Sequence, residues 1–285
     1  MMIIDAHSHL WKRQNGLAVA DKNGRSIVDG ELRQMMPPYM LDGSNTAQML
    51  LANMDYAQVS GAVVTQEYLD GNQDDYLLGC KERYKKRLKI CSLYEKDKPL
   101  RLDGFDGVKI PAQRLENSNL CVLANVFGEI EKQGKFLSID LAAGNKQVGY
   151  MKELIQQCPE LRIAIGHFGM VTREHWEEQI KLARNKNVYI ESGGITWLFH
   201  HEFYPYPSAV KAIQKASSIC GMDKLMWGSD YPRTMVEITY KMSYDFILKS
   251  PELTAQSKEL FLGKNALRFY SFDGLEEMPV IKNML

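Results

Sequence analysis

The sequence predicts an α/β fold, specifically a (β/α)8 TIM barrel with an inserted loop after its first strand. Short apolar runs alternate with longer amphipathic stretches, as expected for a parallel sheet whose strands are joined by helices. Eight such units fit in 285 residues. Barrels of this kind typically have about 250 residues plus additions.

The predicted strands are short and rich in Val, Ile and Leu, and several lack the alternation of a half-exposed strand. Continuous apolar runs of this kind suit parallel strands that are buried on both faces. They lie at Ile3–Ile4, Ala62–Val64, Leu88–Leu93, Gly107–Ile110, Phe136–Leu141, Arg162–Ile165, Val188–Ile190 and Lys224–Trp227.

Helix-like stretches fill the segments between these strands. We expect Asn45 to cap the first helix, because Gln48 follows three residues later. The other stretches are Asp74–Lys85, Leu120–Lys132, Val148–Cys158, Thr172–Asn185, Ser208–Cys220 and Thr254–Phe261. A doubly wound open sheet is the alternative fold. No GxGxxG or GxxxxGK(S/T) motif follows a strand, which disfavours its nucleotide-binding versions.

Two segments are longer than simple connections. Leu10–Ser44 is rich in Gly, Pro and charged residues, and we expect it to form an inserted loop or small lid. Gly193–Pro207 is dense in aromatic residues. In a barrel both would lie at the C-terminal face, where active sites are built. Because exposed aromatic patches often mark interfaces, Thr196–Tyr206 also predicts a homo-oligomer.

Composition limits the function classes. Hydrophobic residues make up 45% and charged residues 25% of the chain, and the net charge is +0. A neutral chain is a poor candidate for binding nucleic acid or an anionic membrane. The five cysteines lack CxxC spacing, which indicates a reducing compartment. With no signal-peptide pattern and no apolar run of about 20 residues, we expect one cytoplasmic domain over residues 1–285.

The first strand ends in Asp5-Ala6-His7-Ser8-His9. Residues two apart on a strand point the same way, so His7 and His9 present two imidazoles to one side. Two close imidazoles suit a divalent transition metal such as zinc. A pair of histidines without a metal is the alternative.

Ionisable residues recur at or in other predicted strands. His167 and Asp230 each follow an apolar run, and Lys109 and Asp140 each lie inside one. A charge in such a place is costly unless it is paired or bound to a metal. Their placement favours a common site, although a salt bridge across the barrel is the alternative for Lys109 and Asp140.

These motifs resemble one known family. The order D-A-H-S-H, F-D-G-V-K-I, G-H-F-G, W-G-S-D-Y-P and G-K-N-A-L-R-F-Y is similar to the amidohydrolase superfamily. More narrowly, it resembles the amidohydrolase 2 group, which includes metal-dependent decarboxylases, lactonases and other hydrolases of ring acids. The resemblance runs from Ile4 to about Tyr270 and identifies no substrate.

The resemblance implies roles for individual residues. His7 and His9 match the two metal ligands of the first strand. Asp230 matches the last-strand aspartate that binds the metal, serves the attacking water, or both. His167 matches a sixth-strand histidine that polarises the substrate or acts in proton transfer.

The fifth strand departs from the family pattern. Asp140 stands where members usually carry a metal-binding histidine. A site of His7, His9, Asp140 and Asp230 suits zinc or manganese. Weak metal binding, a ligand shift to His167 and a lost site remain open alternatives.

The expected function is hydrolysis of an amide, ester or lactone bond in a small organic acid, assisted by a divalent metal. Lys109, Arg233 and His200 are candidates for binding the substrate, although Arg233 is equally compatible with a surface role. A non-oxidative decarboxylase of an aromatic or unsaturated carboxylic acid would use the same residues. A barrel that binds a small molecule without turnover is the third possibility.

Overall fold

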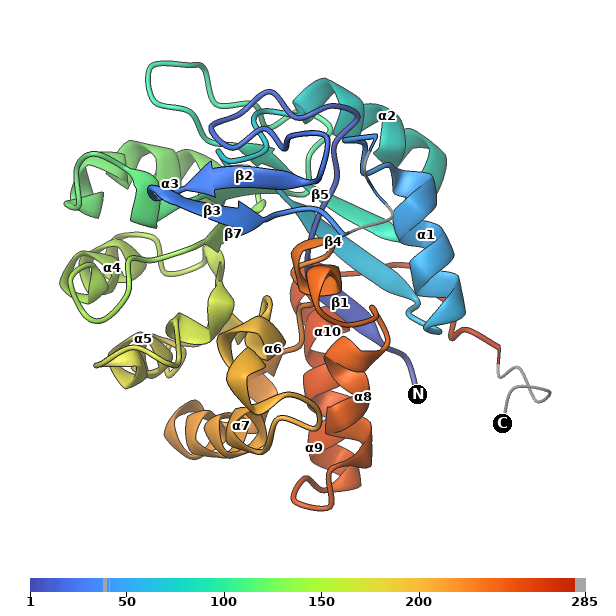
Figure 1. The fold of residues 1–285 in the computed structure, drawn as a ribbon. Helices are drawn as coiled ribbons and strands as arrows, with labels where there is room; N and C mark the ends of the chain where they lie inside the picture. Colours follow the sequence, from blue (N-terminus) through green and yellow to red (C-terminus); the bar gives the residue numbers. More distant parts are fainter. Residues whose placement is uncertain (38–39, 41, 280–285) are drawn as a thin grey trace.

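A computed structural model describes residues 1–37, 40 and 42–279. In this part of the chain eight parallel strands follow one another around a barrel (Figure 1). They are β1 (Ile4–His9), β4 (Gly61–Thr65), β5 (Leu88–Leu93), β6 (Gly107–Ile110), β7 (Phe136–Ile139), β8 (Arg162–Ile165), β9 (Val188–Glu191) and β10 (Leu225–Met226). The predicted TIM-barrel fold is therefore confirmed.

Backbone hydrogen bonds close the barrel between its first and last strands. The Ala6 N–H donates to the Trp227 carbonyl, and the Asp230 N–H donates to the His7 carbonyl, each at 2.9 Å. An open doubly wound sheet would leave this edge unpaired, so that alternative is excluded. The closure also brings His7 next to Asp230, 223 positions later in the chain.

The N-terminal end of the barrel is filled by aromatic side chains. Phe136, from the start of β7, lies inside the barrel against Tyr270 of α10 (Asn265–Tyr270), with ring centroids 4.8 Å apart. Arg162, at the start of β8, donates to the Phe269 carbonyl. This end is thereby closed, and the polar side chains of the barrel collect at the opposite, C-terminal end.

Helices surround the barrel (Figure 1). Besides α10 they are α1 (Ala47–Tyr56), α2 (Asp74–Tyr84), α3 (Ala124–Lys132), α4 (Val148–Gln157), α5 (Trp176–Leu182), α6 (Ile195–Leu198), α7 (Pro207–Cys220), α8 (Met242–Lys249) and α9 (Ala255–Glu259). Within the described residues none is long and apolar enough to cross a bilayer.

Several helix boundaries differ from the prediction. Thr46, not Asn45, caps α1, because its side chain accepts the Met49 N–H at 3.4 Å. Asn45 instead donates from Nδ2 to the His9 carbonyl at 2.7 Å. The predicted helix at 172–185 is shorter, as α5. The one at 254–261 continues through a π-helical turn into α10.

The predicted insertion after the first strand is present and contains an antiparallel hairpin. Its strands are β2 (Arg25–Val28) and β3 (Glu31–Gln34). Asp29 and Gly30 form the turn, with φ values of 53° and 83°. Two-residue hairpin turns need such left-handed residues, and Asp-Gly is a preferred pair for them. Residues 38, 39 and 41 of the predicted insertion lie outside the described residues.

Candidate functional site

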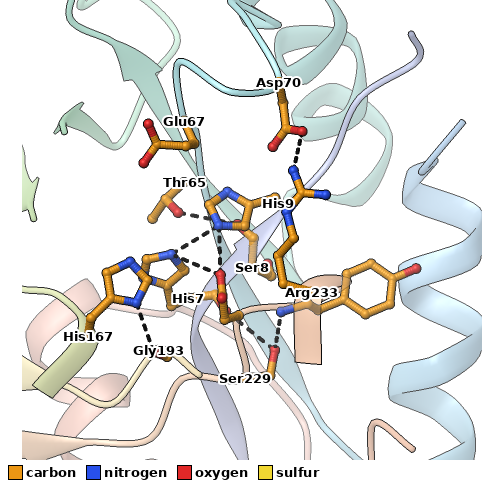
Figure 2. A network of polar contacts seen from close by, with 12 residues as sticks. His7, Ser8, His9, Thr65, Glu67, Asp70, His167, Gly193, Ser229 and Arg233 are labelled. Carbon is orange, nitrogen blue, oxygen red and sulfur yellow. Dashed lines mark hydrogen bonds and ion pairs between the residues drawn. The ribbon is translucent and has the colours of Figure 1, made fainter. Parts of the chain in front are cut away.

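Three donor atoms, from the first barrel strand and from the segment after the last one, meet at the C-terminal end of the barrel. His7 and His9 point to the same side of β1, and their Nε2 atoms lie 3.1 Å apart (Figure 2). The Asp230 Oδ1 atom lies 3.0 Å from Nε2 of His9 and 3.7 Å from Nε2 of His7. All three residues are buried.

Asp5 fixes the relative position of β1 and the segment after β10. Its buried carboxylate accepts hydrogen bonds from the Ser229 N–H at 2.8 Å and from the Tyr240 hydroxyl at 2.7 Å. It also accepts the His7 N–H at 3.1 Å. Burial raises the pKa of Asp5 to about 6, although these hydrogen bonds oppose that shift. The network aligns His7 with Asp230.

Glu191, at the end of β9, orients the first histidine. Its Oε1 atom lies 2.7 Å from Nδ1 of His7, and its Oε2 atom accepts the Gly193 N–H at 2.6 Å. A carboxylate partner assigns the proton to Nδ1, so Nε2 of His7 presents a lone pair. Glu191 was not identified from the sequence. The available signal was its place directly after the apolar run 188–190, since Asp230 likewise comes after an apolar run.

The chemistry of the three donors fits a divalent metal ion. Two imidazole nitrogens and a carboxylate oxygen converge in a buried place, and one shared proton cannot satisfy all of them. Donors bound about 2.0–2.1 Å from one tetrahedral zinc ion would lie about 3.3 Å apart. The observed separations of 3.0, 3.1 and 3.7 Å bracket that value. Asp140 does not belong to this group.

Trp197 fixes the other oxygen of Asp230. Its indole N–H donates to Oδ2 of Asp230 at 2.8 Å, so Oδ1 remains directed at the histidines. Burial alone would raise the pKa of Asp230, but the hydrogen bond and charge of His9 outweigh burial and hold it below its usual range. Asp230 is therefore an ionised carboxylate in the folded protein.

His167 lies beside this cluster, two residues after the end of β8. Its Nδ1 atom lies 2.9 Å from the Gly193 carbonyl, so Nδ1 carries a proton and donates it. Its Nε2 atom lies 3.5 Å from Oδ2 of Asp140 (Figure 2 shows His167 beside His7). Burial opposes a charge on this ring, but Asp140 and Asp230 outweigh burial and raise the pKa of His167 to about 10.

The backbone is strained at both residues proposed for catalysis. His167 and Asp230 have φ values of 52° and 60°, in the left-handed region that favours glycine. Such conformations cost about 1–3 kcal/mol each and collect at functional sites, where surrounding contacts hold them. Here those contacts come from Gly193 and Trp197.

Asp140 and Lys109 form the salt bridge that was the alternative explanation for their burial. Their Oδ1 and Nζ atoms lie 2.6 Å apart, and both side chains are buried. Asp140 joins a second donor group with His7 and His167, whose ligand atoms lie within 4.8 Å of one another. The structure therefore separates Asp140 from His9 and Asp230. Lys109 directs its ammonium at Asp140.

The other two candidates for binding substrate lie in different surroundings. Arg233 donates from Nη1 to the Met35 carbonyl at 2.7 Å and pairs with Asp70. Its guanidinium also lies 4.9 Å from the ring centroid of Trp11. His200 is exposed, and its Nδ1 atom lies 2.6 Å from the Trp197 carbonyl. Neither side chain joins the three-donor group.

The aromatic segment at 196–206 is mostly turned inward. Tyr206 is buried, with its ring centroid 5.4 Å from that of Phe246. The Tyr204 hydroxyl donates to Asp245 at 3.1 Å, whereas Phe203 is 59% exposed. Self-association through this segment stays a prediction.

Solved structures share this fold. An amidohydrolase from Burkholderia multivorans with bound zinc matches with a TM-score of 0.71 and 14% identity, over 96% of this chain and 100% of that chain. A probable 2-pyrone-4,6-dicarboxylic acid hydrolase from Acinetobacter baumannii with citric acid bound matches with a TM-score of 0.66 and 20% identity, over 95% and 100%.

A third solved structure is a 5-carboxyvanillate decarboxylase from Novosphingobium aromaticivorans. It contains manganese and 4-hydroxy-3-methoxy-5-nitrobenzoic acid, and it matches with a TM-score of 0.62 and 13% identity, over 95% of this chain and 96% of that chain. A search of curated proteins found no match. A family model described as "Amidohydrolase" matches residues 4–272, which is most of the chain. The protein is therefore an enzyme of the amidohydrolase family.

Proposed function

We propose that this enzyme is a metal-dependent hydrolase that cleaves an amide, ester or lactone bond in a small organic acid. The observation that carries the proposal is the convergence of the His7, His9 and Asp230 donors at the C-terminal end of the barrel. Family membership favours an enzyme over a barrel that only binds a ligand. Similar folds that hold zinc and manganese support a divalent metal without selecting the ion.

His7, His9 and Asp230 would hold the metal through Nε2, Nε2 and Oδ1. When bound, a divalent cation polarises a carbonyl oxygen and makes nearby water more acidic. Glu191 keeps the His7 Nε2 lone pair available by accepting the Nδ1 proton in a hydrogen bond. Asp140 remains a candidate ligand only through the second group, with His7 and His167.

Asp230 and His167 would move and hold the protons of hydrolysis. The ionised Asp230 carboxylate takes a proton from the attacking water, whose oxygen adds to the substrate carbonyl carbon. His167 donates from Nε2 to the carbonyl oxygen as negative charge develops there. When the C–N or C–O bond breaks, the proton on Asp230 passes to the leaving group.

Lys109 and Arg233 would act mainly through charge. Lys109 keeps Asp140 ionised, and Asp140 in turn favours the protonated form of His167. We propose Arg233 as a partner for a substrate carboxylate, because Arg pairs with carboxylates in two-point geometry. To do so it must exchange part of its contact with Asp70. His200 would contact a substrate only at the outer edge of the site.

The test is a substrate panel with two readouts. Purified protein loaded with zinc or manganese is incubated with lactones, esters and amides of small acids, and separately with aromatic carboxylates. The panel includes 2-pyrone-4,6-dicarboxylate and 5-carboxyvanillate, which appear in the names of similar folds. Acid release without CO2 supports hydrolysis, and CO2 release supports the decarboxylase instead.

A matched pair of variants assigns the activity to this site. Asp230→Asn should reduce it by about 10²–10⁴-fold, whereas Asp245→Asn changes a carboxylate in α8 that pairs with Lys249 and should leave it intact. Activity that is equally high in both variants would come from a contaminant or another site.

A further inference from the structure

The inserted hairpin is anchored on one side of the barrel mouth. Arg233, after β10, donates to the carbonyl of Met35 directly beyond β3. On the β4 side, the Ala18 N–H donates to the Leu69 carbonyl at 3.0 Å. Ala18 and Met35, near the base, form a small buried cluster with Val28, which directly precedes the turn, and Leu69 packs against this cluster. The base of the hairpin is thereby held next to β10 and β4, the two strands that flank β1.

The tip of the hairpin reaches the other side of the mouth. The Asp29 Oδ1 atom, in the turn, lies 3.6 Å from Nη1 of Arg114, in the segment that follows β6. β6 is the fourth strand of the barrel and β10 the eighth, so they lie half a turn apart. A hairpin fixed at both places must cross the C-terminal opening, and Figure 1 shows β2 and β3 extended across the molecule.

The two attachments differ in strength. Hydrogen bonds from Arg233 and to Leu69 join the base to the barrel, whereas the ion pair that joins the turn to the barrel links a side chain that is 66% exposed to one that is 22% exposed. Exposed pairs of this kind contribute little and break readily. All four residues of β3 are exposed, and so is Ile27 of β2. Beyond Val28, the barrel therefore restrains the turn less than it restrains the base.

Arg114 itself is held independently of the hairpin. Its Nε atom lies 3.1 Å from Oε1 of Glu67, two residues after the end of β4. Glu67 is buried close enough to Asp140 and His9 for their charges to influence its pKa, which burial raises. If the tip moves away, Arg114 thus stays at the mouth of the site.

We propose that the β2–β3 hairpin is a lid over the candidate site, hinged at its Arg233 side and latched at its tip by Asp29 on Arg114. Breaking this ion pair lets the tip swing away and opens the mouth to a small molecule. Closing it covers the three-donor group. A hairpin in this place would cover the site whichever reaction the site catalyses.

Hydrogen–deuterium exchange at millisecond resolution tests the latch. Asp29→Asn should accelerate exchange of the amides in residues 25–34 by about two- to fivefold, the range expected for one exposed ion pair. Exchange in β5 and β7 should not change. Glu31→Gln is the matched control, because it removes the same charge from the same hairpin but its partner is Arg33, within the hairpin. The proposed latch would be wrong if the hairpin amides of Asp29→Asn exchanged at the wild-type rate. It would also be wrong if Glu31→Gln accelerated their exchange equally.

Chemical access tests whether the hairpin covers the site. Diethyl pyrocarbonate modifies histidine rings, and the modified peptides are resolved by mass spectrometry. In metal-free Asp29→Asn the modification of His9, in the three-donor group, should accelerate by the same factor as hairpin exchange. The exposed His175 should react at an unchanged rate and serves as an internal reference. An unchanged His9 rate alongside faster hairpin exchange would show that the hairpin moves without covering the site.

Discussion

The Nδ1 atom of His7 lies 2.7 Å from Oε1 of Glu191, and both side chains are buried. Burial lowers the pKa of His7, and the carboxylate of Glu191 only partly opposes that effect. The imidazole is therefore neutral, with its proton on the side of Glu191 and its lone pair on the side of His9 and Asp230. This is the arrangement that a metal-binding histidine requires.

Glu191→Gln should weaken metal binding without unfolding the barrel. The amide is a poorer partner for the Nδ1 proton, and losing such a partner typically costs 10–100-fold in affinity. Zinc affinity measured by competition with a chromophoric chelator checks this. Glu252→Gln, at an exposed position, is the control. Equal affinities in the two variants would mean that Glu191 does not tune His7.

Zinc should raise the melting temperature of the wild-type protein. A ligand at 100 times its Kd stabilises the folded state by about 2.7 kcal/mol. For a chain of this size that corresponds to roughly 4–5 °C. His9→Asn removes one donor and should abolish most of this shift, whereas His175→Asn should keep it. Differential scanning calorimetry with and without chelator measures both. Equal shifts in the two variants would place the zinc elsewhere.

Asp230→Asn should reduce turnover by about 10²–10⁴-fold with the fold intact, because it removes the proposed base. His167→Asn should also reduce turnover but leave the metal content mostly unchanged. Activity and elemental analysis on the same preparations separate the two roles. Loss of metal from His167→Asn would make His167 a ligand. If the turnover of Asp230→Asn stayed within a few-fold of the wild-type value, the proposed mechanism would be wrong.

Lys109→Met should destabilise the protein strongly. It leaves the Asp140 carboxylate buried without its ammonium partner, a change that typically costs about 3–5 kcal/mol. The control is Lys81→Met, which breaks a partly exposed pair with Asp106 and should cost far less. Urea unfolding gives the free energy of unfolding of both variants. Similar decreases in the two would show that the buried pair contributes no more to stability than the partly exposed one.

The same pair gives the protein a predictable pH dependence. Burial opposes the charge of Asp140, but Lys109 outweighs burial and holds the pKa of Asp140 well below 3.8, its ordinary value. Its contribution to stability is therefore present above that pH and is lost as the pH falls through the folded-state pKa. Urea unfolding of Lys109→Met/Asp140→Leu should show a weaker loss of stability in acid than wild type. An identical acid profile would contradict this assignment.

The barrel was predictable because its strands are buried on both faces. Runs such as 88–93 and 107–110 carry that signal in the sequence itself, and the structure places strands at both. The β2–β3 hairpin was not predicted, although Asp29-Gly30 is a typical hairpin turn. Its strands are only four residues long and largely exposed, so they lack a hydrophobic pattern.

The site was predictable in part for a related reason. His7, His9 and Asp230 were expected together, because carboxyl ends of barrel strands meet at one face. The sequence could not predict that Asp140 lies apart from these three residues. Its position depends on the 2.6 Å contact with Lys109 on the neighbouring strand. Glu191 was missed because the predicted strand stopped one residue before it.

Anomalous diffraction from crystals of the zinc-loaded protein, recorded on both sides of the zinc absorption edge, would locate the metal ion. We expect a single strong peak between Nε2 of His7, Nε2 of His9 and Oδ1 of Asp230. A peak held by Asp140 and His167 without His9 and Asp230, or no peak at the C-terminal end of the barrel, would contradict it.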